Sequence, residues 1–180
     1  MTRVLGLDVS TSIVGYAVLD DEEIVCIGHI DFKKCEDFWE KVDHVHEEVN
    51  TLIDAYNPDK CFIEESLMGF STGLSSAGTL FTLSKFNALV SYFVRQKMSQ
   101  TPEYIAANAA RRAVGIKLQQ KKKCGLSHKE QAFEWATQGP LKNRDLPKTR
   151  GGKSFKPFVY DEVDGFIIAL AGTKLNKSIA

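Results

Sequence analysis

The sequence RVLGLDVSTSIVGYAVLD, residues 3–20, decides the fold because it contains two apolar runs separated by a short polar turn. The first run, residues 4–7, is followed directly by an acid, Asp8, and the second run covers residues 13–19. This pattern predicts strand, tight turn and strand. An isolated carboxylate in a β-rich apolar run is costly to bury without a partner. Asp8 therefore either caps the turn or is held toward a metal ion or a phosphate.

The first third of the chain predicts an antiparallel meander followed by a helix and a further strand. We expect strands over residues 3–9, 13–20 and 23–30, because successive strands with short links form a meander. The first strand is apolar on both faces, which indicates a central position in the sheet. Apolar residues at spacings of three and four predict a helix over residues 36–56. The apolar stretch 60–66 follows this helix and should pair in parallel with the first strand.

The middle of the chain predicts a long helix, a short strand and a second, shorter helix. The helix over residues 79–98 is apolar nearly all the way round, so we expect it to be buried on more than one side. Its second covered side is either a subunit interface or the core of the monomer. A short strand is expected over residues 103–107. Asn108 then provides an N-cap for a helix over residues 109–115.

The basic part of the chain predicts a loop, a capped helix and a long irregular segment. We expect a loop at residues 121–123 and a helix over residues 128–138. Ser127 and Glu130 have the spacing of a capping box at the start of that helix. The segment 139–158 is basic and rich in proline and glycine. A structureless segment of this length is either functional or mobile, and we expect it to be poorly ordered without a ligand.

Two acids begin the last predicted helix, which starts at residue 160. Asp161 and Asp164 are three residues apart, so they share one face of the helix, and the helix dipole favours anions near its N-terminus. Ordinary first-turn acids would show the same spacing. At the end of the strand 60–66, Glu64 and Glu65 point to opposite faces, so one of them can join Asp8.

Carboxylates thus stand at the ends of several predicted elements: Asp8, Glu64, Asp161 and Asp164. A cluster of acids is unstable unless a cation is supplied, and oxygen ligands select Mg²⁺ or Mn²⁺. Two such ions activate a water and stabilise the leaving oxygen in phosphodiester cleavage. The predicted fold class is α/β: a five-stranded mixed sheet, with three antiparallel strands and then parallel strands, flanked by helices.

Composition excludes several classes of protein. The chain has 180 residues, of which 43% are hydrophobic, and this is typical of one soluble globular domain over residues 1–180. No apolar run approaches the roughly 20 residues that span a bilayer, and no export signal is recognisable, so we expect a cytoplasmic protein without a membrane partner. The four cysteines lack the spacing of a zinc or redox pair and are expected to be reduced.

Charge is distributed very unevenly along the chain. The net charge is zero, yet residues 20–48 hold eleven acids and three lysines, and residues 111–156 hold thirteen Lys or Arg and three acids. The alternative is two solvated faces without a function. A surplus of ten positive charges in one segment instead favours a surface built for nucleic acid.

Four stretches of the sequence together resemble a known family. LGLDVSTSIVGYAVLD, CFIEESLM, AARRAVGIK and YDEVDGFIIALAG are similar to the four signature regions of the RuvC-type Holliday junction resolvases. That family belongs to the RNase H-like superfamily of metal-dependent nucleases. The resemblance covers nearly the whole chain in order and spacing. It implies an RNase H-like fold, a homodimer, branched DNA as the partner, and cleavage of four-way junctions by paired symmetric cuts.

The resemblance also implies roles for individual residues. Asp8, Glu64, Asp161 and Asp164 match the metal-binding catalytic quartet, with two Mg²⁺ ions per site and Mn²⁺ as a substitute. Glu65 stands where the family commonly has a non-acidic polar residue. Expected DNA contacts are Phe70, as an aromatic wedge, and the basic residues Arg111, Arg112, Lys117, Lys121, Lys122, Lys123 and Lys129.

The chain departs from the bacterial pattern in its basic segments. Residues 121–123 and 142–156 are longer and more basic than expected, and they resemble divergent phage-encoded or organellar relatives. Strict preference for four-way junctions is therefore open. The alternatives are a less selective branched-DNA or flap nuclease and an inert branched-DNA-binding module. The Asp-x-x-Thr-Ser opening also resembles nucleotide-binding proteins of the actin and sugar-kinase type, but these need two such domains, so no nucleotide cofactor is expected.

Overall fold

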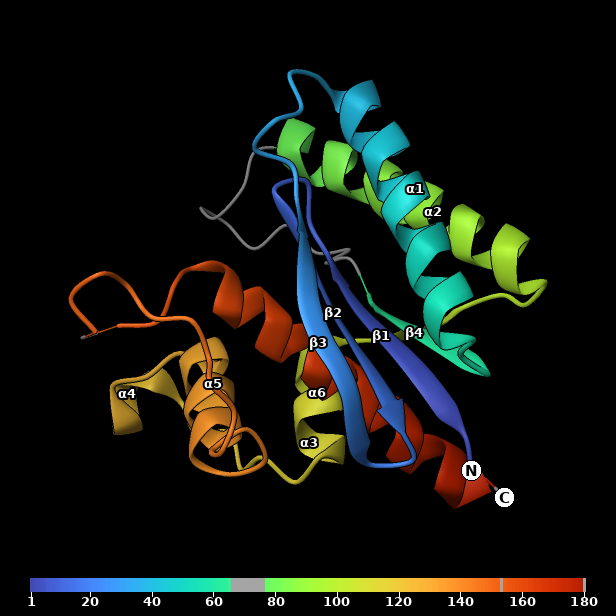
Figure 1. The fold of residues 1–180 in the computed structure, drawn as a ribbon. Coiled ribbons are helices and arrows are strands. Elements are labelled where there is room, and N and C mark those ends of the chain that lie inside the picture. The colour runs from blue at the N-terminus through green and yellow to red at the C-terminus, as the bar shows by residue number, and fades with distance from the viewer. Residues whose placement is uncertain (66–76, 153, 180) are drawn as a thin grey trace.

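The sheet has the predicted mixed topology. The computed structural model describes residues 1–65, 77–152 and 154–179, and within these residues five strands form one sheet in the order β3-β2-β1-β4-β5 (Figure 1). Neighbouring strands pair antiparallel from β3 to β1 and parallel from β1 to β5. The strands are β1 (Arg3–Val9), β2 (Ile13–Asp20), β3 (Glu23–Asp31), β4 (Lys60–Glu64) and β5 (Glu103–Ile105).

Helices cover both faces of this sheet (Figure 1). On one face lie α1 (Phe38–Tyr56) and α2 (Ala77–Met98), which contact each other. The opposite face is covered by α6 (Phe158–Ile179), beside which lie α3 (Ala107–Ala113), α4 (Lys121–Cys124) and α5 (His128–Gln138). No helix of the described residues has the length and apolar character needed to cross a membrane.

Strand β1 is central and buried on both faces, as its apolar run predicts. Leu5 and Leu7 belong to the core cluster under α1 and α2, whereas Val4 belongs to the cluster under α6. Side chains alternate along a strand, so Asp8 lies on the α6 face. The same alternation in β4 buries Phe62 toward α6 and places Glu64 on that face. Glu64 therefore lies on the same face of the sheet as Asp8, as only one of the two adjacent acids can.

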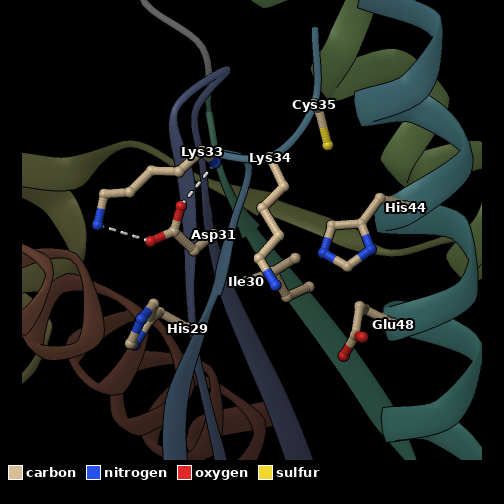
Figure 2. Close-up of a pocket in the computed structure, with 8 residues that line it drawn as sticks. All are labelled: His29, Ile30, Asp31, Lys33, Lys34, Cys35, His44 and Glu48. Carbon is tan, nitrogen blue, oxygen red and sulfur yellow. Dashed lines mark hydrogen bonds and ion pairs between the residues drawn. The ribbon is translucent and has the colours of Figure 1, made fainter.

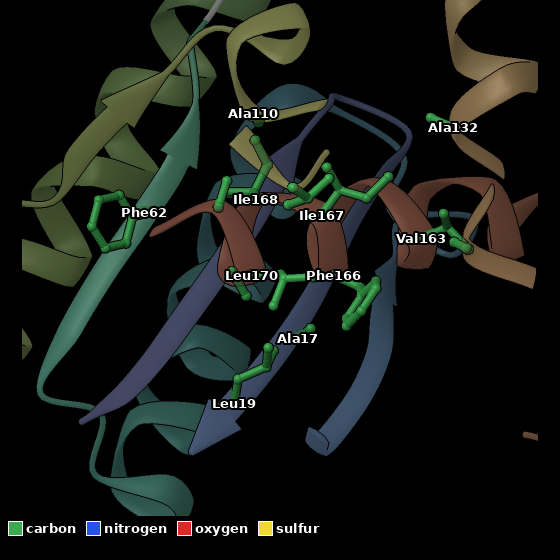
Figure 3. Close-up of a cluster of buried hydrophobic side chains, with 14 of the residues drawn as sticks. Ala17, Leu19, Phe62, Ala110, Ala132, Val163, Phe166, Ile167, Ile168 and Leu170 are labelled. Carbon is green, nitrogen blue, oxygen red and sulfur yellow. The ribbon is translucent and has the colours of Figure 1, made fainter. Parts of the chain in front are cut away.

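Helix α6 lies directly on the backbone of β1 and β2. A Cβ atom at Gly6 would collide with the backbone of Ala169, and one at Gly15 would overlap the carbonyl oxygen of Asp161. Only glycine permits such a close approach of helix and strand. Farther along α6, Phe166 and Ile167 fill the core between helix and sheet (Figure 3). This contact brings the first turn of α6 to the end of β1.

The local signals for helix ends are confirmed in part. Asp37 caps α1 by accepting hydrogen bonds from the amides of Trp39 and Glu40, so the helix begins two residues later than predicted. The capping box of Ser127 and Glu130 is present at the start of α5. The predicted cap at Asn108 is wrong: α3 begins at Ala107, and the Asn108 side chain instead contacts Arg111 and His128.

Two further expectations need correction. Residues 121–123 form the start of α4 rather than a loop, and Gly125, in a left-handed conformation, ends this helical turn. Helix α2 is not a central helix of the monomer, because Phe81 and Tyr92 are 63% and 50% exposed. The alternative, that this side of α2 meets a second subunit, stays a prediction. The four cysteines are free, as expected.

Candidate active site

Four acidic side chains converge at one edge of the sheet. Asp8 lies near the end of β1 and Glu64 ends β4, and these two strands are parallel neighbours with Leu7 opposite Ile63. Parallel neighbours end at the same edge of a sheet, where open α/β sheets place their ligands. The first two turns of α6 add Asp161 and Asp164. Asp8 lies close enough to the other three carboxylates for their negative charges to raise its pKa.

Two basic side chains among the described residues are paired with these acids. The Lys129 Nζ atom lies 3.1 Å from Asp161 Oδ1 and 2.9 Å from Asp164 Oδ2. The Arg111 guanidinium donates a hydrogen bond from Nη2 to Asp164 Oδ1 at 3.1 Å, and it also contacts Asn108. Asp164 is thus held from both sides, whereas Asp8 and Glu64 have no such ion pair within the described part of the chain.

The excess of negative charge changes the protonation of the acids. Burial, together with the charge of Asp164, raises the pKa of Glu64 to about 7, although Arg111 and Lys129 oppose the shift. Burial and the charges of Glu64, Asp164 and Asp161 raise the pKa of Asp8 well above its usual range. These are the shifts expected when carboxylates share a site that lacks enough positive charge.

The Lys129 ammonium responds in the opposite direction. Burial alone would lower its pKa, but the charges of Asp164, Asp8 and Asp161 outweigh burial and raise it. Lys129 is therefore a permanent cation at neutral pH. It stands between Asp161 and Asp164, where a bound metal ion would also be attracted.

The donor chemistry of the site fits a hard divalent cation. All four candidate ligands offer carboxylate oxygens, and oxygen donors are the preferred ligands of Mg²⁺ and Mn²⁺. Within the described residues, no three His, Cys, Asp or Glu side chains already stand in a metal-binding arrangement. The Lys129 ammonium instead lies within ion-pair distance of both Asp161 and Asp164.

The residues predicted to contact DNA lie in two environments, the acidic cluster and the exposed surface. Arg111 is 8% exposed and belongs to the acidic cluster, as does Lys129. Exposed positions are occupied by Arg112, Lys117, Lys121, Lys122 and Lys123. Phe70 lies outside the described residues. Glu65 is exposed and follows the end of β4.

One part of the site could not be inferred from the sequence pattern. Glu162, between the two aspartates of α6, is 7% exposed, and its Oε1 atom lies 2.7 Å from Nδ1 of His29 on β3. The His29 ring stacks on Phe158 with 4.1 Å between ring centroids. These contacts attach the first turn of α6 to the edge strand and so help to orient Asp161 and Asp164. The available signal was the position of Glu162 between the two aspartates, because a residue there points to a different face of the helix.

A cavity elsewhere on the molecule does not belong to the acidic cluster. It has a volume of about 580 Å³ and lies between the end of β3 and α1, where its lining includes Asp31, Lys33, His44 and Glu48 (Figure 2). The β3 ribbon passes between His29 and His44, and Lys33 pairs with Asp31 at 2.8 Å. None of the four converging carboxylates lines this cavity.

The fold is RNase H-like, and four acidic side chains lie together at one edge of its sheet. The family model described as crossover junction endodeoxyribonuclease RuvC matches residues 4–127, more than half of the chain. The chain therefore belongs to the RuvC family, whose members are metal-dependent nucleases. The match includes Asp8, Glu64 and Arg111 and ends before Lys129, Asp161 and Asp164.

Two curated relatives have the same description, crossover junction endodeoxyribonuclease RuvC. The protein of Bacteroides fragilis is 37% identical over 70 residues, which are 37% of each chain. The protein of Finegoldia magna is 36% identical over 67 residues, 35% of this chain and 41% of the relative. The chain thus aligns with less than half the length of these curated relatives.

Solved structures confirm the fold. Thermus thermophilus RuvC in complex with a Holliday junction substrate matches with a TM-score of 0.68 and 14% identity, over 99% of this chain and 96% of that chain. The yeast mitochondrial Holliday junction resolvase Ydc2 matches with a TM-score of 0.64 and 15% identity, over 99% and 80% of the two chains. At these identities the similarity establishes the RNase H-like fold alone.

Proposed function

We propose that this protein is an endonuclease that resolves Holliday junctions by paired symmetric cleavage of phosphodiester bonds. The observation that carries the proposal is the convergence of Asp8, Glu64, Asp161 and Asp164 from three elements of an RNase H-like fold. Burying carboxylates that raise one another's pKa does not stabilise a fold, whereas acids with perturbed pKa values are typical of functional sites. Membership of the RuvC family supports this chemistry.

The same four carboxylates are the proposed metal ligands, with two Mg²⁺ ions per site and Mn²⁺ as a substitute. Such ions supply Lewis-acid chemistry, because they lower the pKa of a bound water and neutralise charge on the leaving oxygen. The protein must present the carboxylates in ionised form. Burial and Asp164 raise the pKa of Glu64 to about 7. A bound cation favours the ionised carboxylate, so we expect cation binding to release protons.

The two basic side chains of the site have separate roles in this proposal. Arg111 is a positioning residue, since its buried ion pair fixes the orientation of the Asp164 carboxylate. Lys129 is nearer to the surface, with 44% of its side chain exposed. Its ammonium can remain with Asp161 and Asp164 or turn to a DNA phosphate that enters the site, and in both positions it reduces the negative charge that would repel the substrate.

DNA binding is assigned to the exposed basic residues beyond the carboxylates. Arg112, Lys117 and the three lysines of α4 are exposed and follow one another on the chain before α5. Contacts of this type neutralise phosphates and carry little sequence information. The Thermus thermophilus protein of the same fold was solved with a Holliday junction, which supports branched DNA as the partner here.

A homodimer would provide the two cuts that junction resolution requires. Two-fold symmetry places two equivalent sites on the two sides of a branch. Helix α2 exposes two large aromatic side chains on one face, Phe81 and Tyr92. We propose this face of α2 as the dimer contact. The proposal of Phe70 as the aromatic wedge is supported by the family resemblance alone. We expect the protein in the cytoplasm of a bacterial or phage-infected cell, or in an organelle.

The experiment that tests the proposed site compares two matched variants. Asp8→Asn should abolish Mg²⁺-dependent cleavage of a labelled four-way junction and leave junction affinity near the wild-type value. Glu65→Gln removes an exposed carboxylate one residue after Glu64 and should leave cleavage intact. Wild-type protein that binds the junction without cutting it in Mg²⁺ or Mn²⁺ would instead support the inert binding module. Persistent cleavage by Asp8→Asn would remove Asp8 from the site.

A further inference from the structure

Residues 142–156 are here called the basic arm, and their described part forms a hairpin-like excursion between α5 and α6. Lys148 and Phe155 form a β-bridge. Beyond it, the Thr149 amide donates to the Ser154 carbonyl at 2.8 Å, and before it the Lys156 amide donates to the Pro147 carbonyl at 2.9 Å. The two sides of the arm are therefore paired over several residues, although the segment contains no helix and no longer strand among its described residues. The predicted mobility of segment 139–158 is not tested by these contacts.

Apolar and polar contacts attach the arm to the rest of the protein. The Phe155 ring lies edge-to-face against Phe133 of α5, with 5.2 Å between centroids. Leu146 and Phe155 pack against the core cluster under α6. The Arg144 guanidinium donates a hydrogen bond to the carbonyl oxygen of Ile24 on β3 at 3.1 Å. The hairpin is thus held by its apolar side chains, which leaves most of its charged side chains free to face solvent.

The charge of the arm is almost entirely positive. Its described basic residues are all exposed, and none of them forms an ion pair with a described carboxylate: Lys142, Arg144, Lys148, Arg150 and Lys156. Asp145 is the one acid of the segment. Lys60, Lys97 and Lys177, at the other end of the molecule, each pair with an acid. The arm therefore concentrates unneutralised positive charge.

The arm lies next to the catalytic carboxylates along the chain. Lys156 precedes Asp161 by five residues, and Phe158 begins the helix that carries both aspartates. In Figure 1 the arm, α4 and α5 lie on the side of the sheet that is away from α1 and α2. The arm joins the end of α5 to the start of α6, and the first turn of α5 holds Lys129, which pairs with Asp161 and Asp164 of α6.

We propose that the basic arm is a second DNA-binding surface, which contacts the phosphate backbone of the duplex flanking the cleaved strand through Lys148, Arg150 and Lys156. This inference rests on the proposed function and adds a contact surface to it. Cations that are held in place before binding lose less conformational entropy than cations on a flexible tail. Because phosphates carry no sequence information, the arm should raise affinity for any duplex flank.

The test is the salt dependence of binding to an immobile four-way junction, measured in EDTA so that cleavage does not interfere. The triple variant Lys148→Gln, Arg150→Gln, Lys156→Gln removes three proposed phosphate contacts. Each contact contributes roughly 0.9 to the slope of log affinity against log salt. The slope should therefore fall by about 2.7, so that raising salt from 50 to 200 mM weakens wild-type binding roughly 40-fold more than it weakens binding by the variant.

A matched control separates local contacts from net charge. The triple variant Lys60→Gln, Lys97→Gln, Lys177→Gln removes the same charge from the other end of the sheet and its helices. Its slope should stay within the error of the wild-type slope. An arm variant whose slope matches that of the control would overturn the proposal and assign the arm to another partner.

The outcome for the arm is distinguishable from the outcome for the proposed function. Binding in EDTA is measured without any chemical step, so loss of slope supports the arm even if no cleavage is found. In Mg²⁺ the junction concentration at half-maximal cleavage should rise for the arm variant and not for the control. Cleavage by wild type with an unchanged slope in the arm variant would retain the nuclease and reject the arm.

Discussion

Replacing Glu64 by Gln should stabilise the metal-free protein at alkaline pH while it abolishes cleavage. Burial and Asp164 raise the pKa of Glu64 from an ordinary value of 4.5 to about 7. A carboxyl whose pKa is higher in the folded than in the unfolded state favours folding while it is protonated, and this stability is lost as the pH rises from 4.5 through 7. The neutral amide of Gln carries no such penalty.

The expected size follows from the pKa difference. At pH 8 the penalty on wild type approaches about 3 kcal/mol, and at pH 5 it is below about 1 kcal/mol. For a chain of this length, 1 kcal/mol corresponds to roughly 2–4 °C in Tm. In EDTA, the Tm of Glu64→Gln minus the Tm of wild type should therefore increase by roughly 5–10 °C from pH 5 to pH 8. Mg²⁺ should then stabilise wild type more than the variant, because ligands that bind the folded state raise Tm.

Thermal unfolding followed by circular dichroism measures both values on the same samples. Glu65→Gln is the matched control, because it removes an exposed carboxylate at the adjacent position. Its Tm difference from wild type should not change with pH. Two results would refute the repulsion among the buried carboxylates. One is a Glu64→Gln variant no more stable than wild type at pH 8, and the other is a Tm difference from wild type that is the same at pH 5 as at pH 8.

Three further predictions concern the support of the site and its DNA contacts. Arg111→Met removes one partner of a buried ion pair with Asp164 and should cost about 3–5 kcal/mol, seen as a lower Tm in EDTA; equal stability would show that the pair is unimportant. Gly15→Ala places a Cβ atom against the carbonyl of Asp161. It should lower the free energy of unfolding by about 1–3 kcal/mol and abolish cleavage. Gly151→Ala, where a Cβ atom meets open space, should change neither stability nor cleavage. Neutralising Lys121, Lys122 and Lys123 together should weaken binding to junction and duplex alike and flatten the salt dependence; unchanged affinity would make α4 a solvated turn.

The sequence predicted the parts of the site that depend on local pattern. The strand predicted over residues 3–9 is present and carries Asp8. The spacing of three placed Asp161 and Asp164 on one helix face, where Lys129 contacts both. The strand predicted over residues 60–66 is present as β4, which ends two residues earlier, at Glu64. These inferences succeed because strand and helix periodicities are properties of neighbouring residues.

The parts that failed or were missed depend on contacts between distant residues. The ion pairs of Arg111 and Lys129 with acids of α6 were missed. Arg111 pairs with Asp164, 53 residues away along the chain, and Lys129 pairs with Asp161, 32 residues away. The expectation that both residues contact DNA stays a prediction. The pair of His29 and Glu162 joins residues 133 positions apart. Asn is a residue type that often caps helices, yet the Asn108 side chain contacts His128, 20 residues away along the chain. No local pattern carries such information.

The most direct test of the proposed function uses one labelled immobile four-way junction, with a flap and a linear duplex of the same sequences. Each is incubated with the protein and Mg²⁺, Mn²⁺ or EDTA, and the cuts are mapped on all strands. A homodimer with two equivalent carboxylate sites predicts paired nicks at symmetric positions of the junction, dependent on metal, and an intact duplex. Equal cutting of flap and junction would identify a general debranching nuclease, and absence of metal-dependent cutting would contradict the assignment of the four carboxylates as a nuclease site.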